Sequence, residues 1–223
     1  MNILTFEENG INLKKRRLMK KFSCSIIIIF IISLLIIFSG CPKSAAIEES
    51  ENMFMPTFAK SGMKLIYHVI YFGDEYDFIV HVNLLSKDIS FDWLMTAPIN
   101  SSGTVTIREK ALKSAVKLFN YYSDGDTLEF EDYTSVWVSD LVYDALNKNK
   151  NIIIDAGDGN EMLTYENNEK LSVIINGEAS DLDCIYSSSD LFGWFWILDN
   201  RKFPIIVKME IGWTITLTEI ITE

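Results

Sequence analysis

Cysteine and histidine are scarce in this chain of 223 residues, which has three cysteines and two histidines. Cys24 lies within an apolar N-terminal segment and Cys41 ends that segment, so Cys184 is the single cysteine in the rest of the sequence. One cysteine forms no intramolecular disulfide and no cysteine-rich metal site. Both are therefore excluded for the part of the chain that follows residue 41.

Basic residues are also few after residue 41. Residues 1–41 hold six of the 20 basic residues but two of the 31 acidic ones, which leaves 14 against 29 and a net charge of −15. Affinity for nucleic acids comes mainly from lysines and arginines that neutralise phosphates, and anionic lipids attract basic segments in the same way. The charge balance therefore argues against nucleic acid as a partner and against membrane docking through charge.

The segment from Met19 to Cys41 has the three parts of an export signal. Two lysines follow Met19, an apolar run interrupted by one serine covers residues 26–38, and the small residues Ser39 and Gly40 precede Cys41. A membrane-spanning helix needs about 20 apolar residues. The thirteen residues of this run therefore favour a cleaved signal. The alternative is an uncleaved apolar anchor with an incidental cysteine.

The tetrapeptide from Phe38 to Cys41 resembles the lipobox of bacterial lipoproteins, with phenylalanine where leucine is usual. This resemblance implies cleavage between Gly40 and Cys41 and acylation of Cys41, with palmitate as one acyl chain. Each buried methylene contributes about 0.8 kcal/mol, so several chains on one cysteine hold a protein at a bilayer. Pro42 stands where an aspartate would imply retention in the inner membrane. The resemblance therefore implies an outer-membrane protein on the periplasmic side.

The signal divides the chain into four parts. Residues 1–18 precede it and form an extension that is not translated if Met19 is the true start. Residues 19–40 are the signal. Residues 41–58 are polar, acidic and without periodicity, which is typical of a flexible tether. Residues 59–223 are long enough for one domain with a full core.

Alternating apolar and polar residues predict strands over most of residues 59–223. Strands at 64–72, 76–84 and 89–95 are expected to form an antiparallel meander. Further strands are expected at 134–138, 151–155, 162–165, 171–175, 182–187 and 193–198. A long one at 205–217 bends or breaks at Gly212.

Helical spacing predicts a helix over residues 109–119 and a second one over 141–146, with Ser139 as its N-cap. The expected fold class is therefore α+β and mostly β, with a strongly curved antiparallel sheet, or half-barrel, and two short helices.

The segment from Trp194 to Ile220 is similar to the closing strands of bacterial envelope domains of the LolA and LolB type, and of a related lipoprotein family defined as a domain of unknown function. Asp199, Pro204 and the strand at 209–220 match the turn, the proline and the last long strand of those domains. Residues 67–82 resemble their first hairpin. The resemblance implies a half-barrel with an apolar hollow for an acyl chain or another lipid, and no catalytic residues.

Histidines and carboxylates give two candidate metal sites. His68 and His81 lie on neighbouring expected strands, where Asp77 or Asp92 would complete a metal or acid–base site. Such histidines are more often solvated or hydrogen-bonded to neighbours. The segment DAGDGNE places three acids close together, as in a calcium loop, but without EF-hand spacing. Asp155, Asp158 and Glu161 are its acids, and Asp-Gly turns of this kind are mostly hairpin corners.

The sequence gives little support for a catalytic nucleophile. Cys184 lies on an alternating strand without a basic partner nearby in the sequence, which is typical of a buried small residue. Ser139 and the serines at 187–189 lack the context of a nucleophile elbow.

The five tryptophans are the remaining candidates. They fill a core or line an apolar ligand cavity: Trp93, Trp137, Trp194, Trp196 and Trp213. We therefore expect a non-enzymatic lipoprotein of the envelope, without a cofactor, that binds a lipid or another apolar ligand or supports envelope assembly. The alternative is a structural or interaction lipoprotein with a filled core and no ligand.

Overall fold

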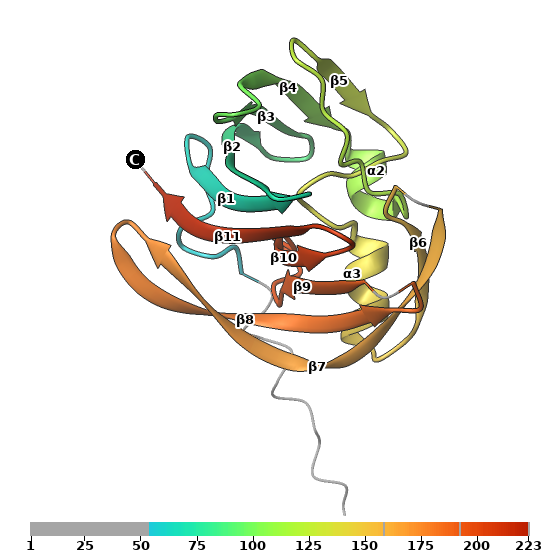
Figure 1. Cartoon of the computed structure of the whole chain (residues 1–223). Helices are drawn as coiled ribbons and strands as arrows, with labels where there is room; N and C mark the ends of the chain where they lie inside the picture. Colours follow the sequence, from blue (N-terminus) through green and yellow to red (C-terminus); the bar gives the residue numbers. More distant parts are fainter. Residues whose placement is uncertain (1–53, 158, 192, 223) are drawn as a thin grey trace, which may run out of the picture. The chain divides into compact units, whose positions relative to one another are not determined.

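The computed structural model describes residues 54–157, 159–191 and 193–222 (Figure 1). In these residues, eleven strands form one curved sheet in the order β5-β4-β3-β2-β1-β11-β10-β9-β8-β7-β6, and two helices accompany it. Most neighbouring strands are antiparallel, and the pairs β4–β5 and β11–β7 are parallel. The expected fold class, mostly β with a strongly curved sheet and two short helices, is confirmed.

The bounds of the elements follow the chain. The strands are β1 (Lys64–Tyr71), β2 (Asp74–Leu85), β3 (Ile89–Met95), β4 (Ser101–Ile107), β5 (Thr127–Phe130), β6 (Ile152–Asp155), β7 (Asn160–Ile175), β8 (Glu178–Ser189), β9 (Trp194–Leu198), β10 (Ile206–Glu210) and β11 (Thr214–Ile221). The helices are α2 (Glu109–Ser114) and α3 (Asp140–Asn147). Ser139 is the N-cap of α3 as predicted, since its side chain accepts a hydrogen bond from the backbone of Val142.

Strand β11 connects two parts of the sheet. Its first residues pair with β10, whereas Glu219 and Ile220 pair with Ile174 and Ile175 at the end of β7. Asn176 strengthens this junction, because its backbone N–H donates to the carbonyl of Ile220 over 2.9 Å. Strands β7 to β11 therefore close into a ring, and β1 to β5 extend from β11 as a separate curved wing (Figure 1).

Two groups of buried side chains form the interior of the described residues. The larger group joins β1 to β4 with α2 and the segment around Trp137, and it continues into the ring through residues such as Val173, Cys184 and Val207. The smaller group joins α3 to β7, β8, β9 and β10 through residues such as Tyr143, Leu146, Phe195 and Ile197. Trp213 and Ile215 pack against both groups, so the two cores meet at the start of β11.

Several predicted boundaries are wrong. Residues 134–138 form isolated bridges in place of a strand, because Val136 has a φ of 66°, which lies outside the β region. The helix ends at Ser114, since Ala115 is extended and residues 116–119 form backbone hydrogen bonds with Asp155 and Thr134. Strand β7 is one strand of 16 residues, where two were expected, and β4 and β5 were not expected at all.

The chain contacts the domain before the expected end of the tether at residue 58. The Phe58 ring packs edge-on against Phe203, with 6.0 Å between the ring centroids. The side-chain amide of Asn200 donates to the carbonyl of Phe54 over 2.9 Å. Residues 54–58 therefore lie against the loop between β9 and β10.

Candidate functional site

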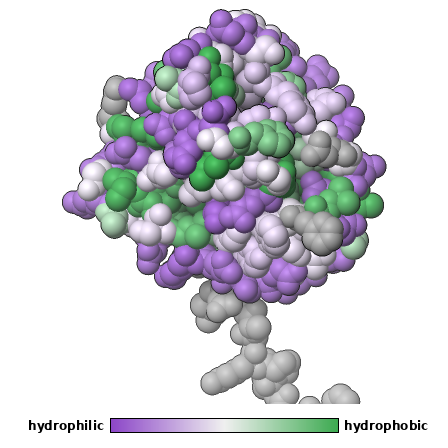
Figure 2. Space-filling model, in the orientation of Figure 1, coloured by the Kyte–Doolittle hydropathy of each residue, from purple (hydrophilic) through white to green (hydrophobic). Residues whose placement is uncertain are grey.

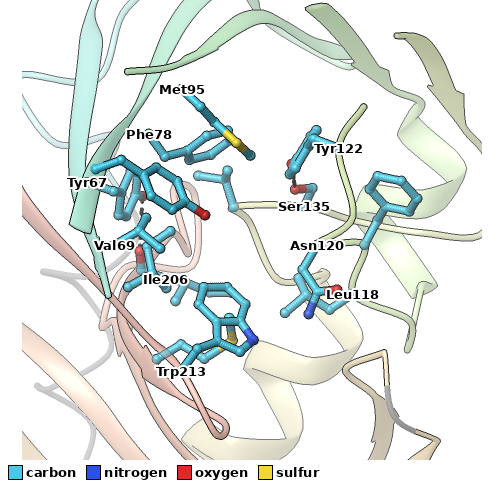
Figure 3. A pocket seen from close by; sticks show the side chains of 15 residues that line it. Tyr67, Val69, Phe78, Met95, Leu118, Asn120, Tyr122, Ser135, Ile206 and Trp213 are labelled. Carbon is cyan, nitrogen blue, oxygen red and sulfur yellow. Dashed lines mark hydrogen bonds between the residues drawn. The ribbon is translucent and has the colours of Figure 1, made fainter. Parts of the chain in front are cut away.

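An apolar pocket lies on the concave side of the sheet, where the two cores meet (Figure 3). Strands β1, β2 and β3 supply one side, the start of β11 with β10 supplies another, and the segments around residues 118–122 and 135–136 complete it. The cavity has a volume of about 60 Å³. It therefore collects residues from elements that are far apart in the sequence.

Burial separates the floor of the pocket from its mouth. The floor consists of buried side chains, and the mouth of half-buried ones. The floor residues are Tyr67, Val69, Phe78, Leu118, Ser135, Val136, Ile206 and Met209. The mouth residues are Tyr76, Met95, Phe119, Asn120, Tyr122, Trp213 and Ile215. Ligand would therefore enter past aromatic and amide side chains onto an apolar floor.

Most polar groups of the pocket are already paired. The Tyr67 hydroxyl donates to the carbonyl of Ile206 over 3.0 Å, and the hydroxyls of Tyr122 and Ser135 are hydrogen-bonded to each other. Burial raises the pKa of both tyrosines above the usual value of 10, so both are neutral at physiological pH. The pocket walls therefore carry no charge.

Asn120 provides the one fully buried polar side-chain atom on the described lining that has no hydrogen-bond partner. Its side-chain nitrogen donates to the carbonyl of Ala156 over 2.8 Å, which fixes the orientation of the amide. Its Oδ1 is buried and has no hydrogen-bond partner among the described residues. A buried acceptor without a donor costs about 1–3 kcal/mol, so this atom offers a ligand donor or a water molecule a favourable contact.

The size of the cavity limits its ligand. One water molecule needs about 10–15 Å³ of such space, so 60 Å³ corresponds to about five water-sized positions. A ligand with about that many non-hydrogen atoms fits, whereas a long acyl chain does not. The rest of the concave face is occupied by the chain itself, including Trp137 and Phe203, whose rings lie 5.8 Å apart.

Comparisons with known proteins found no similar protein. Neither the family models, nor the curated proteins, nor the solved structures include a match to this chain. The resemblances to the lipobox and to envelope domains of the LolA and LolB type therefore stay predictions from the residues quoted above. Gly40 and Cys41 lie outside the described residues. Among the described helices, neither is long and apolar enough to cross a membrane.

The structure places the five tryptophans in different surroundings. Trp213 is the one that lines the pocket. Trp93 and Trp137 are buried in the larger core, and their indole N–H groups have no partner among the described residues. Trp196 donates to Glu169 and lies under the Lys208 amine, which is 4.5 Å from the ring centroid. Trp194 is 39% exposed at the start of β9.

The candidate metal residues are not brought together. Strand pairing places His68 on β1 opposite Asp77 on β2. His81 on β2 lies opposite Lys64, which is four residues from His68 along β1. His68 lies 3.5 Å from Glu75 and 3.6 Å from Asp77, in a partly exposed position. Within the described residues, no group of three or more histidine, cysteine and acidic side chains is placed to hold a metal ion.

The DAGDGNE segment, for which a hairpin corner was favoured over a calcium loop, connects the antiparallel strands β6 and β7. The Asp155 carboxylate accepts from the backbone N–H groups of Gly157 and Gly159, at 3.0 and 3.3 Å. Glu161 is buried at the start of β7. Asp158 lies outside the described residues.

Cys184, Ser139 and Ser187 are buried, and each donates a hydrogen bond to a backbone carbonyl. Cys184 is fully buried, and burial raises the pKa of its thiol to about 12. Its Sγ donates to the carbonyl of Leu182. The Ser139 hydroxyl donates to the carbonyl of Ala115 over 2.7 Å, and Ser187 is buried against the backbone of Phe195.

Several pocket residues were not predicted from the sequence. Tyr67 and Tyr76 stand on expected strands, but alternation does not distinguish a core position from a cavity wall. Asn120 and Tyr122 follow a predicted helix that in fact ends earlier. The available signal was the pair of tyrosines at 121–122, which follows the predicted helix and belongs to no expected strand.

Proposed function

We propose that this chain is a lipid-anchored protein of the bacterial cell envelope, whose domain is a non-enzymatic module that binds a small apolar ligand. The lipobox-like residues at 38–41 support the anchor. The observation that carries the binding role is the apolar pocket between the two cores. Its mouth contains half-buried aromatic side chains, and its buried unpaired acceptor, Oδ1 of Asn120, gives a ligand a defined orientation.

The proposed ligand is smaller than the acyl chain or lipid that the sequence led us to expect. A pocket for a whole acyl chain would require the concave face to be hollow. The segment 115–138 and the loop around Phe203 fill most of that face. A small ligand, or one small apolar group of a larger molecule, matches the space that is left.

A second candidate function rests on a different observation. Several large apolar side chains are exposed at turns, above all Phe72, which is 89% exposed at the tip of the β1–β2 hairpin. On the face seen in Figure 2, hydrophobic side chains form several patches separated by hydrophilic ones. A structural or interaction lipoprotein that binds a partner protein through such patches, with no small ligand, is therefore the alternative.

The anchor is tested by the mass of the protein from membranes of the native cell. The expected mature protein begins at an acylated Cys41. Replacement of Cys41 by alanine should abolish acylation, while Cys24→Ala, within the signal, should still give the acylated form. Acylation that persists in Cys41→Ala would contradict the assignment.

The binding role is tested with small apolar compounds and the purified full chain in a neutral maltoside detergent. Trp213 lines the pocket, so its fluorescence should change when cyclohexanol or 3,3-dimethyl-1-butanol binds, and not with palmitate. Ile215→Phe places extra volume in the pocket and should reduce binding. Ile174→Phe, at a position 38% exposed on β7, is the matched control. A protein that binds neither alcohol would favour the alternative without a ligand.

A further inference from the structure

Aromatic rings make up much of the pocket lining. Six of its residues are aromatic, and the rings of Phe78 and Tyr122 lie 5.1 Å apart, with Phe119 5.5 Å from Tyr122. The six are Tyr67, Tyr76, Phe78, Phe119, Tyr122 and Trp213. Figure 3 shows Trp213 across the cavity from Phe78 and Met95, so rings lie on opposite walls.

The described residues that line the pocket include no charged side chain. The Asp74 carboxylate lies near enough to the mouth to contribute, after burial and Tyr71, to the raised pKa of Tyr76. Beyond the pocket, the chain after residue 41 carries 29 acidic and 14 basic residues. The net charge therefore favours the approach of cations to the protein, and Asp74 adds a negative charge near this opening.

We propose that the ligand of this pocket is a small organic cation whose charged nitrogen carries methyl groups, such as a trimethylammonium group. The inference rests on the proposed function, because it names the ligand class of the same pocket. A cation is attracted to the faces of tryptophan and tyrosine rings, and several such rings around one site recognise quaternary ammonium groups.

Methylation of the nitrogen follows from the hydrogen-bonding groups on the walls. A primary ammonium has three N–H donors, and the described lining offers one fully buried side-chain acceptor without a partner, Oδ1 of Asn120. Two donors would stay unpaired in an apolar site, which is unfavourable. A quaternary ammonium has no N–H group to leave unpaired, and its methyl groups match the apolar floor around Val69 and Ile206.

The size of the group agrees with the cavity. A trimethylammonium group attached to one further carbon has five non-hydrogen atoms, which is about the number of water-sized positions in 60 Å³. Longer substituents would have to extend through the mouth, past Asn120 and Tyr76. A hydroxyl on such a substituent would then reach the Asn120 acceptor or solvent.

The test compares choline with 3,3-dimethyl-1-butanol, in which a carbon replaces the charged nitrogen. Binding is measured by calorimetric titration of the purified full chain in a neutral maltoside detergent. Both compounds have the same shape, so the ratio of their affinities reports the charge. We expect choline to bind about tenfold tighter, since cation–π contacts are strengthened in a desolvated site. Ethanolamine, which has a primary ammonium, should bind more weakly than choline.

Variants separate this recognition from general stability. Trp213→Leu should remove most of the preference for choline over the alcohol, and Trp213→Phe should keep part of it. Trp194→Leu, outside the pocket, should leave both affinities unchanged. Thermal unfolding of each variant confirms that it is folded.

The outcomes distinguish the two proposals. Equal affinity for choline and the alcohol would overturn the cationic ligand and leave a small apolar ligand supported. Tighter binding of ethanolamine than of choline would overturn the methylated nitrogen. Binding of none of these compounds would overturn both proposals.

Discussion

Gly103 is the position where the structure makes the sharpest prediction about stability. It lies on β4 directly opposite Trp93 on β3. A Cβ at this position would lie 2.4 Å from the backbone oxygen of Asp126 and 2.8 Å from Cζ2 of Trp93. Because the first neighbour is backbone, the turn before β5 would have to move. That oxygen also accepts the backbone N–H of Thr104 over 2.8 Å, so the β4–β5 pairing is affected.

The expected effect of Gly103→Ala combines three contributions. Overpacking of a filled site costs about 1–3 kcal/mol. Loss of the Thr104 hydrogen bond costs about 1 kcal/mol. Replacement of glycine restricts the unfolded chain and returns about 0.4–1 kcal/mol. We therefore expect the free energy of unfolding to fall by about 2 kcal/mol, as the combination of these values.

Urea unfolding followed by tryptophan fluorescence measures this change, and hydrogen exchange of the Thr104 amide locates it. Exchange at Thr104 should be faster in Gly103→Ala than in the unmodified chain. Ser102→Ala, at the exposed neighbouring position, is the control and should change stability by less than about 0.5 kcal/mol. A Gly103→Ala variant as stable as the unmodified protein would refute the reasoning.

Three further predictions concern other parts of the domain. Phe72 has a φ of 49° and the following Gly73 has a φ of 94°, which is a turn that favours the pair Asn-Gly. Phe72→Asn should therefore stabilise the fold by about 1 kcal/mol and raise the thermal midpoint. A lower midpoint would contradict this. The Arg201 guanidinium lowers the pKa of Asp144 below its usual 3.8, so their pairing stabilises the fold above that pH and is lost as pH falls through the lowered pKa. Urea midpoints between pH 7 and 2 should therefore fall less steeply for Asp144→Asn, and an unchanged slope would count against the pair. Because Cys184 is fully buried and burial raises its pKa to about 12, it should react with iodoacetamide at pH 8 only after unfolding. Rapid labelling of the peptide that contains Cys184 in the folded protein would be inconsistent with this burial.

Strong alternation made the first three strands predictable, and weak alternation hid the next two. Strands β1, β2 and β3 follow the predicted ranges to within two residues. Strand β4 contains serine, glycine and threonine at most positions, and only Val105 and Ile107 mark its buried face. The four residues of β5 owe their conformation to parallel pairing with β4 and not to a local pattern.

Polar residues in the middle of β7 explain why it was divided in the prediction. Residues 166–169 have no apolar side chain, which is typical of a turn. In the structure residues 166–168 are exposed and Glu169 accepts a hydrogen bond from Trp196, and pairing with β8 continues across them with one register shift after Tyr165. Long-range pairing thus decided the conformation where local sequence favoured a break.

The pocket was the least predictable feature for a different reason. An inward-facing tyrosine has the same alternation whether it fills a core or lines a cavity, so the sequence placed Tyr67 and Tyr76 on a face without showing that a space lies beside them. Trp213 was among the candidates, but its partners come from segments that only the fold brings together. The cavity depends on distances between elements, which periodicity does not encode.

The position of the pocket follows from the topology of β11. Gly212, with a φ of 84°, separates β10 from β11, and the predicted break at this residue is what sets Trp213 at the start of a strand shared by both parts of the sheet. The larger core extends from the β1–β5 wing into the β7–β11 ring, whereas the smaller core joins α3 to strands of the ring. Side chains at the junction, such as Trp213 and Ile215, have to serve both cores, which leaves a small space between them. A ligand in that space contacts residues of both cores, so its binding should stabilise the wing and the ring together, by an amount set by its concentration relative to its Kd.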